Sequence, residues 1–385
     1  MIDRSEFAAW LRLLETPGIG RESARALLAR FGSPEAVVGA SAAALGAVVG
    51  ADVAAALTKP PAAYEARLDA AWRWLHGGAA VDVASGATRD AIPLGDPRYP
   101  AALLAAADPP LLLYVHGRIE LLQKPSIAIV GSRNPTAQGL ENARAFAAHL
   151  SGAGWVVVSG LALGIDGAAH EGALEGGAGT IAVVGTGLDI AYPLRHRELT
   201  ARIAARGLVV SEFAIGTPAL PPHFPIRNRI IAGLARGTLV VEAALRSGSL
   251  ITARLAADAG REVFAIPGSI HSPQARGCHA LLKQGAKLVE SAADVVEELG
   301  SPDGAAATSR HRHDTTVPLR VDHAHASAKA DPLLDALGFD PIGLDELIAR
   351  TGQSAAALSA RLLDLELEGR VSRLPGQVFQ RIERA

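Results

Sequence analysis

The sequence predicts an α/β protein with a doubly wound parallel sheet at its centre, a small helical domain before it and a compact helical unit with a β-hairpin after it. Three observations predict this class. Six short runs that are apolar on both faces recur within residues 125–298, with helical stretches between them, which is typical of a parallel sheet covered on both sides. Helical spacing of apolar residues dominates residues 1–90 and the start of the last 55 residues. The length of 385 residues fits two or three domains.

The composition is that of a folded protein with nearly balanced charge. Hydrophobic residues make up 49% of the chain and charged residues 20%, with 37 basic against 39 acidic side chains, which excludes a mostly disordered chain and a polybasic tail protein. Cys278 is the only cysteine, so the chain has no intrachain disulfide and no cysteine-rich zinc module. We expect a cytoplasmic protein, because the sequence shows neither a secretory signal nor an apolar stretch long enough for a membrane span.

Residues 1–90 predict a helical domain of the SAM-like or helix-hairpin-helix-like kind. Apolar residues have helical spacing at 7–14, at 21–30 and in an alanine-rich pair near 41–57. The turn at 16–20 contains two glycines around Ile19, and its free N–H groups could contact a DNA phosphate. A plain connector between helices is the alternative, since only Arg21 and Arg25 add positive charge nearby.

Residues 91–124 predict an ordered, proline-rich connector that packs on the core and contains one short strand. The next segment, 125–298, predicts a Rossmann-like domain. Its six strand-like runs lie at 127–130, 156–158, 181–184, 208–210, 239–241 and 263–266. Residues 125–290 carry 15 basic and 11 acidic side chains, and no other segment of the chain is net positive. We therefore expect a polyanionic partner, if there is one, to bind here.

The loops that follow these strands are rich in glycine and serine, and ligands of open parallel sheets bind at that edge. Small residues let backbone N–H groups and hydroxyls approach a phosphate, and an arginine can hold it with two N–H donors. A second basic element opens a predicted helix with Arg-Asn-Arg, where two positive charges oppose the helix dipole unless an anion is bound. The candidate binding residues are Gly131, Ser132, Arg133, Gly160, Arg227, Asn228, Arg229, Ser247, Gly248 and Ser249.

The sequence does not predict a catalytic set, a metal site or a cofactor. No Gly-Lys pair occurs, so there is no Walker phosphate loop, and the Gly-x-Gly at 185–187 lacks the third glycine of a dinucleotide fingerprint. Asp166 and His170 are spaced as an acid–base pair, but an aspartate at a helix start with a nearby histidine favours a helix cap. Aromatic residues are only 4% of the chain, which argues against stacking by many rings and for contacts mainly to phosphate.

The C-terminal part predicts a linker at 299–330 and a winged-helix domain at 331–385, with three helices and a hairpin. The linker holds two His-x-His pairs, at 311–313 and 323–325, which we interpret as solvated residues, with a metal site as the alternative. The winged-helix segment carries 6 basic and 9 acidic side chains, so phosphates should repel it. We expect this domain to contact another protein or to have a regulatory role.

Five phrases of the sequence together resemble the DNA-processing protein A family (DprA, also called Smf). The stretches at 99–100 and 108–114 are also similar to that family, so the resemblance covers about 92–290 densely. The five phrases are IVGSR at 129–133, SGLALGID at 159–166, FPIRNRIIAGL at 224–234, RSGSLITA at 246–253 and FAIPG at 264–268.

The resemblance implies a dimeric bacterial protein without enzymatic activity that binds incoming single-stranded DNA during natural transformation. It also implies that the protein protects the strand and loads the RecA recombinase onto it. Arg133 and Arg227 match the family's strand-contacting positions, whereas Ile230 stands where relatives can have an aromatic base contact. For self-association and the recombinase, motif position suggests His279, Leu282 and Leu288.

A nucleotide-processing enzyme is the alternative, because the predicted sheet is similar to that of lysine-decarboxylase-like phosphoribohydrolases. Those enzymes carry a Pro-Gly-Gly-x-Gly-Thr loop and a catalytic glutamate. The corresponding region here, residues 242–249, lacks the glycine loop. The sequence therefore favours the DNA-binding function.

Overall fold

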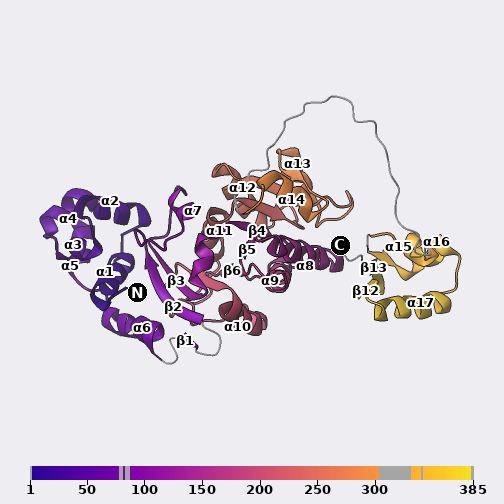
Figure 1. Cartoon of the computed structure of the whole chain (residues 1–385), viewed down its shortest axis with the longest axis horizontal. Helices are drawn as coiled ribbons and strands as arrows, with labels where there is room; N and C mark the ends of the chain where they lie inside the picture. Colours follow the sequence, from indigo (N-terminus) through magenta and orange to yellow (C-terminus); the bar gives the residue numbers. More distant parts are fainter. Residues whose placement is uncertain (1, 78–80, 83–86, 303–330, 340, 383–385) are drawn as a thin grey trace.

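A ten-stranded sheet with helices on both faces forms the centre of the protein (Figure 1). The computed structural model describes residues 2–77, 81–82, 87–302, 331–339 and 341–382. Seven strands of the sheet are parallel, in the order β7-β6-β5-β4-β8-β9-β10. These are β4 (Ser126–Val130), β5 (Val156–Ser159), β6 (Thr180–Val183), β7 (Leu208–Ser211), β8 (Gly237–Val240), β9 (Glu262–Ala265) and β10 (Lys287–Leu288).

The strand order confirms the predicted doubly wound, Rossmann-like fold and all six predicted runs. From β4 the chain moves outward through β5, β6 and β7, and it then returns to place β8 on the other side of β4. The order of the sheet thus reverses between β4 and β8, where the loops that leave the two strands diverge and open a crevice. The seventh strand, β10, was not predicted because two residues give no periodic signal.

Alternate residues of β4 explain why helices cover both faces. Ala128 and Val130 pack in one apolar cluster, and Ile127 and Ile129 pack in another on the opposite face. Helices α11 (His223–Leu234), α12 (Ser249–Asp258) and α13 (Arg276–Lys283) contribute to the first cluster. Helices α8 (Ala137–Gly152), α9 (Ile165–Gly176) and α14 (Ala292–Leu299) contribute to the second, and α10 (Arg197–Arg206), after the short η2 (Leu194–His196), packs beside α9.

The N-terminal segment is helical, as predicted. Gly18, in the turn between the first two helices, has φ +85°, a conformation that glycine adopts without strain. This domain shares its apolar core with the sheet through Ala91, Leu112 and Tyr114. Its helices are α1 (Arg4–Glu15), α2 (Arg21–Phe31), α3 (Pro34–Gly39), α4 (Ala42–Val49), α5 (Ala51–Thr58) and α6 (Tyr64–His76).

The expectation of one short strand in the connector is wrong. β3 (Leu112–Gly117) and the end of β2 (Ala87–Pro93) both lie in it. β3 extends the parallel sheet by antiparallel pairing with β7, and β2 pairs antiparallel with β3. A proline ends β2 and two prolines precede β3. The backbone N–H groups within the two strands therefore remain available for pairing. β2 also runs across the boundary expected at residue 90. The remaining elements are β1 (Val81–Asp82), α7 (Ala101–Leu104) and η1 (Ile119–Gln123).

The last segment has the predicted winged-helix architecture. Its helices enclose one apolar cluster with the hairpin strands, and β11 adds a third strand to the hairpin. The elements are α15 (Pro332–Leu337), β11 (Ile342–Gly343), α16 (Leu344–Thr351), α17 (Ala355–Leu367), β12 (Val371–Leu374) and β13 (Val378–Arg381). The two His-x-His pairs of the predicted linker lie outside the described residues.

In the described part of the chain, no helix combines the length and the apolar character that a membrane crossing requires.

Candidate nucleic-acid interface

A cavity of about 690 Å³ opens where the sheet order reverses, beyond the carboxyl ends of β4 and β8. We call it the strand-end cavity. Eight of the ten candidate binding residues line it, although they come from three separate segments. They are Gly131, Ser132, Arg133, Arg227, Asn228, Ser247, Gly248 and Ser249. Gly160 lines a smaller adjoining cavity of about 70 Å³, together with Arg133 and Arg227.

The loop after β4 is held by backbone contacts that leave no space for a larger residue. A Cβ on Gly131 would lie 2.6 Å from Ile165 Cγ1 and 2.9 Å from the Glu242 carbonyl oxygen. The next residue, Ser132, donates its N–H to that carbonyl at 2.7 Å and accepts a hydrogen bond from the Ile165 N–H at 3.1 Å. The loop is thereby fixed to both β8 and α9, so that Arg133 projects from a rigid base.

Arg133 is an exposed cation that forms no ion pair with any residue that the structure describes. Its guanidinium carbon lies 5.5 Å from the centre of the Phe224 ring, within the range of a cation–π contact. Arg246, in the loop after β8, also lines the cavity, is exposed and has no ion-pair partner in the described ranges. The cavity therefore presents two exposed arginines without an ion-pair partner among the described residues, one on the β4 side and one on the β8 side.

Arg227 is buried, with only 4% of its surface exposed. Its Nη1 donates hydrogen bonds to the carbonyl oxygens of Gly160 and Val183, so the side chain joins the ends of β5 and β6. Burial lowers the pKa of Arg227 to about 10, against the opposing effect of the Asp166 carboxylate. The guanidinium stays charged at neutral pH and contributes to the potential of the cavity from beneath its surface.

Asp166 supports the loop after β5 and does not cap a helix, which corrects the expected cap. The N-cap position of α9 is Gly164, and the Asp166 carboxylate accepts hydrogen bonds from the Gly160 N–H at 3.1 Å and the Ala162 N–H at 3.3 Å. His170 hydrogen-bonds to Thr180 at 2.8 Å, and burial lowers its pKa to about 3. The imidazole is thus neutral at physiological pH and bonded within the core, away from Asp166.

The loop after β8 places a serine pair and an open glycine at the cavity. Ser247 and Ser249 hydroxyls are 2.7 Å apart, and the Asn228 side-chain amide donates to the Gly248 carbonyl oxygen at 3.4 Å. Gly248 has φ −63°, and nothing lies within 4 Å of the position that a Cβ would occupy. Its exposed backbone therefore remains accessible to a ligand.

Glu242, the glutamate that follows β8, is occupied by the fold. Its carboxylate accepts hydrogen bonds from the Thr136 N–H at 2.9 Å and the Thr136 hydroxyl at 2.6 Å, and Thr136 is the N-cap residue of α8. Burial raises the pKa of Glu242, although these hydrogen bonds oppose the effect. The carboxyl group fastens the start of α8 and does not project into the cavity as a free general base.

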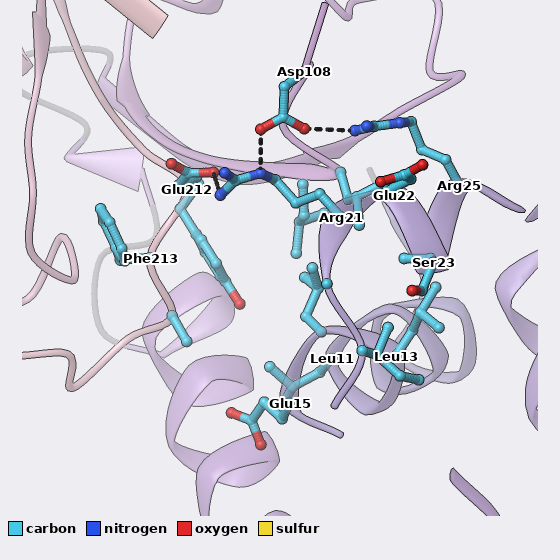
Figure 2. A pocket seen from close by; sticks show the side chains of 18 residues that line it. Leu11, Leu13, Glu15, Arg21, Glu22, Ser23, Arg25, Asp108, Glu212 and Phe213 are labelled. Atoms are coloured by element: carbon cyan, nitrogen blue, oxygen red, sulfur yellow. Dashed lines mark hydrogen bonds and ion pairs between the residues drawn. The ribbon is translucent and has the colours of Figure 1, made fainter. Parts of the chain in front are cut away.

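Arg229, the tenth candidate residue, points away from both cavities. Its Nη2 donates to the Glu212 carboxylate, and its Nε lies 3.5 Å from Asp108. Arg21 and Arg25 of α2 also bind Asp108, at 2.6 and 2.8 Å (Figure 2). We call these five residues the charged cluster. All of them except Arg229 line a separate cavity of about 810 Å³ between the N-terminal helices and the sheet.

Of the three residues suggested for self-association, Leu288 lies on the edge strand of the sheet, and His279 and Leu282 lie on α13. β10 is the last strand, and Leu288 on it is 53% exposed. His279 on α13 bonds to the Gly268 carbonyl oxygen at 2.9 Å, whereas Leu282 packs partly against the core.

Comparison with known proteins gives the chain its family. The family described as DNA recombination-mediator protein A matches residues 90–300. The chain belongs to this family. The DprA winged helix domain matches residues 318–377, in agreement with the C-terminal architecture.

Named relatives of the family support this assignment. Protein Smf of Escherichia coli is 41% identical over 302 residues, which cover 76% of this chain and 78% of that protein. DNA processing protein DprA of Streptococcus pneumoniae is 50% identical over 203 residues, 53% of this chain and 72% of the relative.

Two solved structures share the fold. DprA from Streptococcus pneumoniae superposes with a TM-score of 0.65 and 36% identity, covering 77% of this chain and 98% of that one. DNA processing protein A from Helicobacter pylori superposes with a TM-score of 0.50 and 31% identity, covering 56% of this chain and 97% of that one. That structure is described as giving insights into its single-stranded DNA binding mode.

Proposed function

We propose that this protein binds single-stranded DNA at the strand-end cavity with little sequence preference, protects the strand and loads the RecA recombinase onto it during DNA processing and natural transformation. One observation carries the proposal. Arg133 and Arg246, both exposed and without an ion pair in the described ranges, lie on the two sides of a cavity that loops of glycine and serine also line. A polyphosphate backbone supplies the negative charges and the close backbone approach that such a surface accommodates.

Family membership and the described subject of the Helicobacter pylori structure add support. Among the described residues, two carboxylates at this edge of the sheet are engaged by the fold, which favours binding without bond cleavage. Glu242 is hydrogen-bonded to Thr136, and Asp166 is hydrogen-bonded within its own loop. We therefore propose no enzymatic activity. Robust release of free base from nucleoside monophosphates by the purified protein would favour the phosphoribohydrolase alternative.

The test is a titration of fluorescent single- and double-stranded oligonucleotides at two salt concentrations. Arg133→Ala should weaken single-strand binding for every sequence and reduce the salt slope by roughly 0.7, the value for one phosphate contact. Arg118→Ala is the matched control. Arg118 is an exposed arginine at the amino edge of the sheet, opposite the cavity, and its removal should leave both quantities unchanged. Equal effects of the two variants would contradict a localised site.

The proposal extends to a homodimer and a RecA contact at the edge formed by α13 and β10. Leu288 is exposed on the edge strand, where unpaired backbone groups can pair with a second chain. Leu288→Asp should convert the dimer to a monomer in light scattering. A dimer that persists in Leu288→Asp would place the contact elsewhere. Nucleation of RecA on coated single strands, measured with wild type and His279→Ala, tests the recombinase contact.

A further inference from the structure

An aromatic pair lies at the mouth of the strand-end cavity. Tyr192 comes from the loop after β6, and Phe224 comes from the first turn of α11. The ring centres are 5.4 Å apart with an interplanar angle of 33°. Both residues line the strand-end cavity and the smaller cavity beside it, together with Arg133.

The exposure of Tyr192 is unlike that of the other tyrosines. The chain has four, and Tyr64, Tyr99 and Tyr114 are 7%, 4% and 0% exposed in the apolar cores. Tyr192 is 45% exposed, so packing in the core does not account for an aromatic ring at this position. A ring left open to solvent beside a cationic cavity is available to a ligand with its own π face.

The ring of Phe224 is held in position by Gly185, Arg133 and Tyr192. A Cβ on Gly185 would lie only 3.2 Å from Phe224 Cδ1, so the absence of a side chain there lets the ring pack against the backbone. Arg133 lies over the ring at 5.5 Å and Tyr192 tilts against it. The supported ring limits the movement of Tyr192, and a preorganised platform loses less entropy when a base stacks on it.

The guanidinium of Arg133 lies beside the aromatic rings of Phe224 and Tyr192. A nucleotide offers a phosphate to the first and a base to the second. We propose that Tyr192, supported by Phe224, stacks on one unpaired base of the bound strand while Arg133 holds an adjacent phosphate. This inference rests on the proposed function. It gives the site a physical basis for preferring single strands, because duplex bases are already stacked on their neighbours.

The experiment compares two probes of equal length, an oligodeoxythymidylate and an abasic deoxyribose-phosphate oligomer. Tyr192→Ala should weaken binding of the thymidylate probe roughly 5- to 100-fold, the range for one base–aromatic stack, and leave binding of the abasic probe unchanged. Tyr192→Phe, which keeps the ring, should bind both probes like wild type. Arg133→Ala should weaken binding of both probes alike, because both carry phosphates.

The outcomes separate this inference from the function on which it rests. If wild type binds the thymidylate probe tightly and Tyr192→Ala binds it equally well, the stacking role is wrong and the proposed function stands. If Tyr192→Ala weakens both probes equally, Tyr192 supports the cavity and does not stack. If wild type binds neither probe better than duplex, the proposed function itself fails. An oligonucleotide with one 2-aminopurine adds a direct readout, since fluorescence quenching on binding should be lost in Tyr192→Ala and kept in Tyr192→Phe.

Discussion

Arg227 shows how one residue of a predicted binding motif can act from inside the protein. Its charge interacts with those of both Arg133 and Asp166, and its two hydrogen bonds to main-chain carbonyls join the ends of β5 and β6. The sequence predicted a strand contact for this arginine because the motif is basic. Burial was not predictable from the motif, since a charge is rarely buried without partners and the partners come from distant segments.

Truncation of Arg227 should therefore affect stability first. Arg227→Ala leaves two buried carbonyl groups without their hydrogen-bond donor and removes a positive charge that favours the buried Asp166 carboxylate, and we expect the free energy of unfolding to fall by about 3–5 kcal/mol. Urea denaturation followed by circular dichroism measures it. Unchanged stability together with lost DNA binding would show that Arg227 contacts the strand directly.

Two glycines of the cavity should respond in opposite ways to the same substitution. Gly248→Ala meets no neighbouring atom and keeps an allowed φ, so the fold should tolerate it while the added methyl group obstructs a phosphate that approaches the backbone. We expect unaltered thermal stability and weaker single-strand binding. Gly131→Ala places a Cβ against Ile165 and the Glu242 carbonyl, so it should destabilise the protein by about 1–3 kcal/mol. Tight single-strand binding by stable Gly248→Ala would contradict a backbone–phosphate contact there.

At the scale of elements, α11 connects the strand-end cavity to the charged cluster. Arg227 and Asn228 face the strand ends, whereas Arg229 faces Glu212 and Asp108 on the other side of the helix. Through Asp108, α2 of the N-terminal domain is fastened to the same helix by Arg21 and Arg25. The position of α11, and with it one wall of the cavity, thus depends on an ion-pair network between domains.

Acid should weaken this network. Burial raises the pKa of Asp108, but Arg25, Arg21 and Arg229 outweigh that effect, and the net pKa is lowered. The stabilisation of the folded state by the Asp108 ion pairs is therefore complete above the unfolded pKa of about 3.9, and it is lost as the pH falls through the lowered pKa. Asp108→Asn should cost about 1–2 kcal/mol at neutral pH, reduced by solvent screening, and the difference from wild type should shrink below about pH 4. Urea midpoints across this range provide the check, and a difference that does not change with pH would exclude ionisation of Asp108 as its cause.

At the scale of the whole molecule, the Rossmann-like domain and the winged helix have net charges of opposite sign. Arg361 on α17 pairs with Asp331 at 2.7 Å and lies 3.7 Å from Asp364 and 4.0 Å from Glu368, so its charge is compensated. The segment 331–385 has a net charge of −3, opposite in sign to that of residues 125–290. This distribution favours a protein partner for the winged helix.

Deletion of residues 331–385 should accordingly leave most single-strand affinity intact. The acidic segment contributes repulsion to a phosphate backbone, so the truncated protein should bind with similar or slightly higher affinity at low salt. Fluorescence anisotropy with the same oligonucleotides measures this. A loss of more than about tenfold would mean that the winged helix contacts DNA.

The sequence predicted six strands of the parallel sheet, the order of the loops that follow them and eight of the residues that line the strand-end cavity. Runs such as 127–130 are apolar on both faces, which favours strands covered on both sides, and ligands of such a sheet bind at its carboxyl edge. Tertiary packing, in contrast, sets which basic residues are exposed and unpaired. It exposed Arg133 and Arg246, buried Arg227, turned Arg229 to the N-terminal domain and brought Tyr192 beside Phe224. The physical reason is that solvent exposure and ion pairing depend on neighbours distant in sequence, whereas local periodicity depends on the backbone alone.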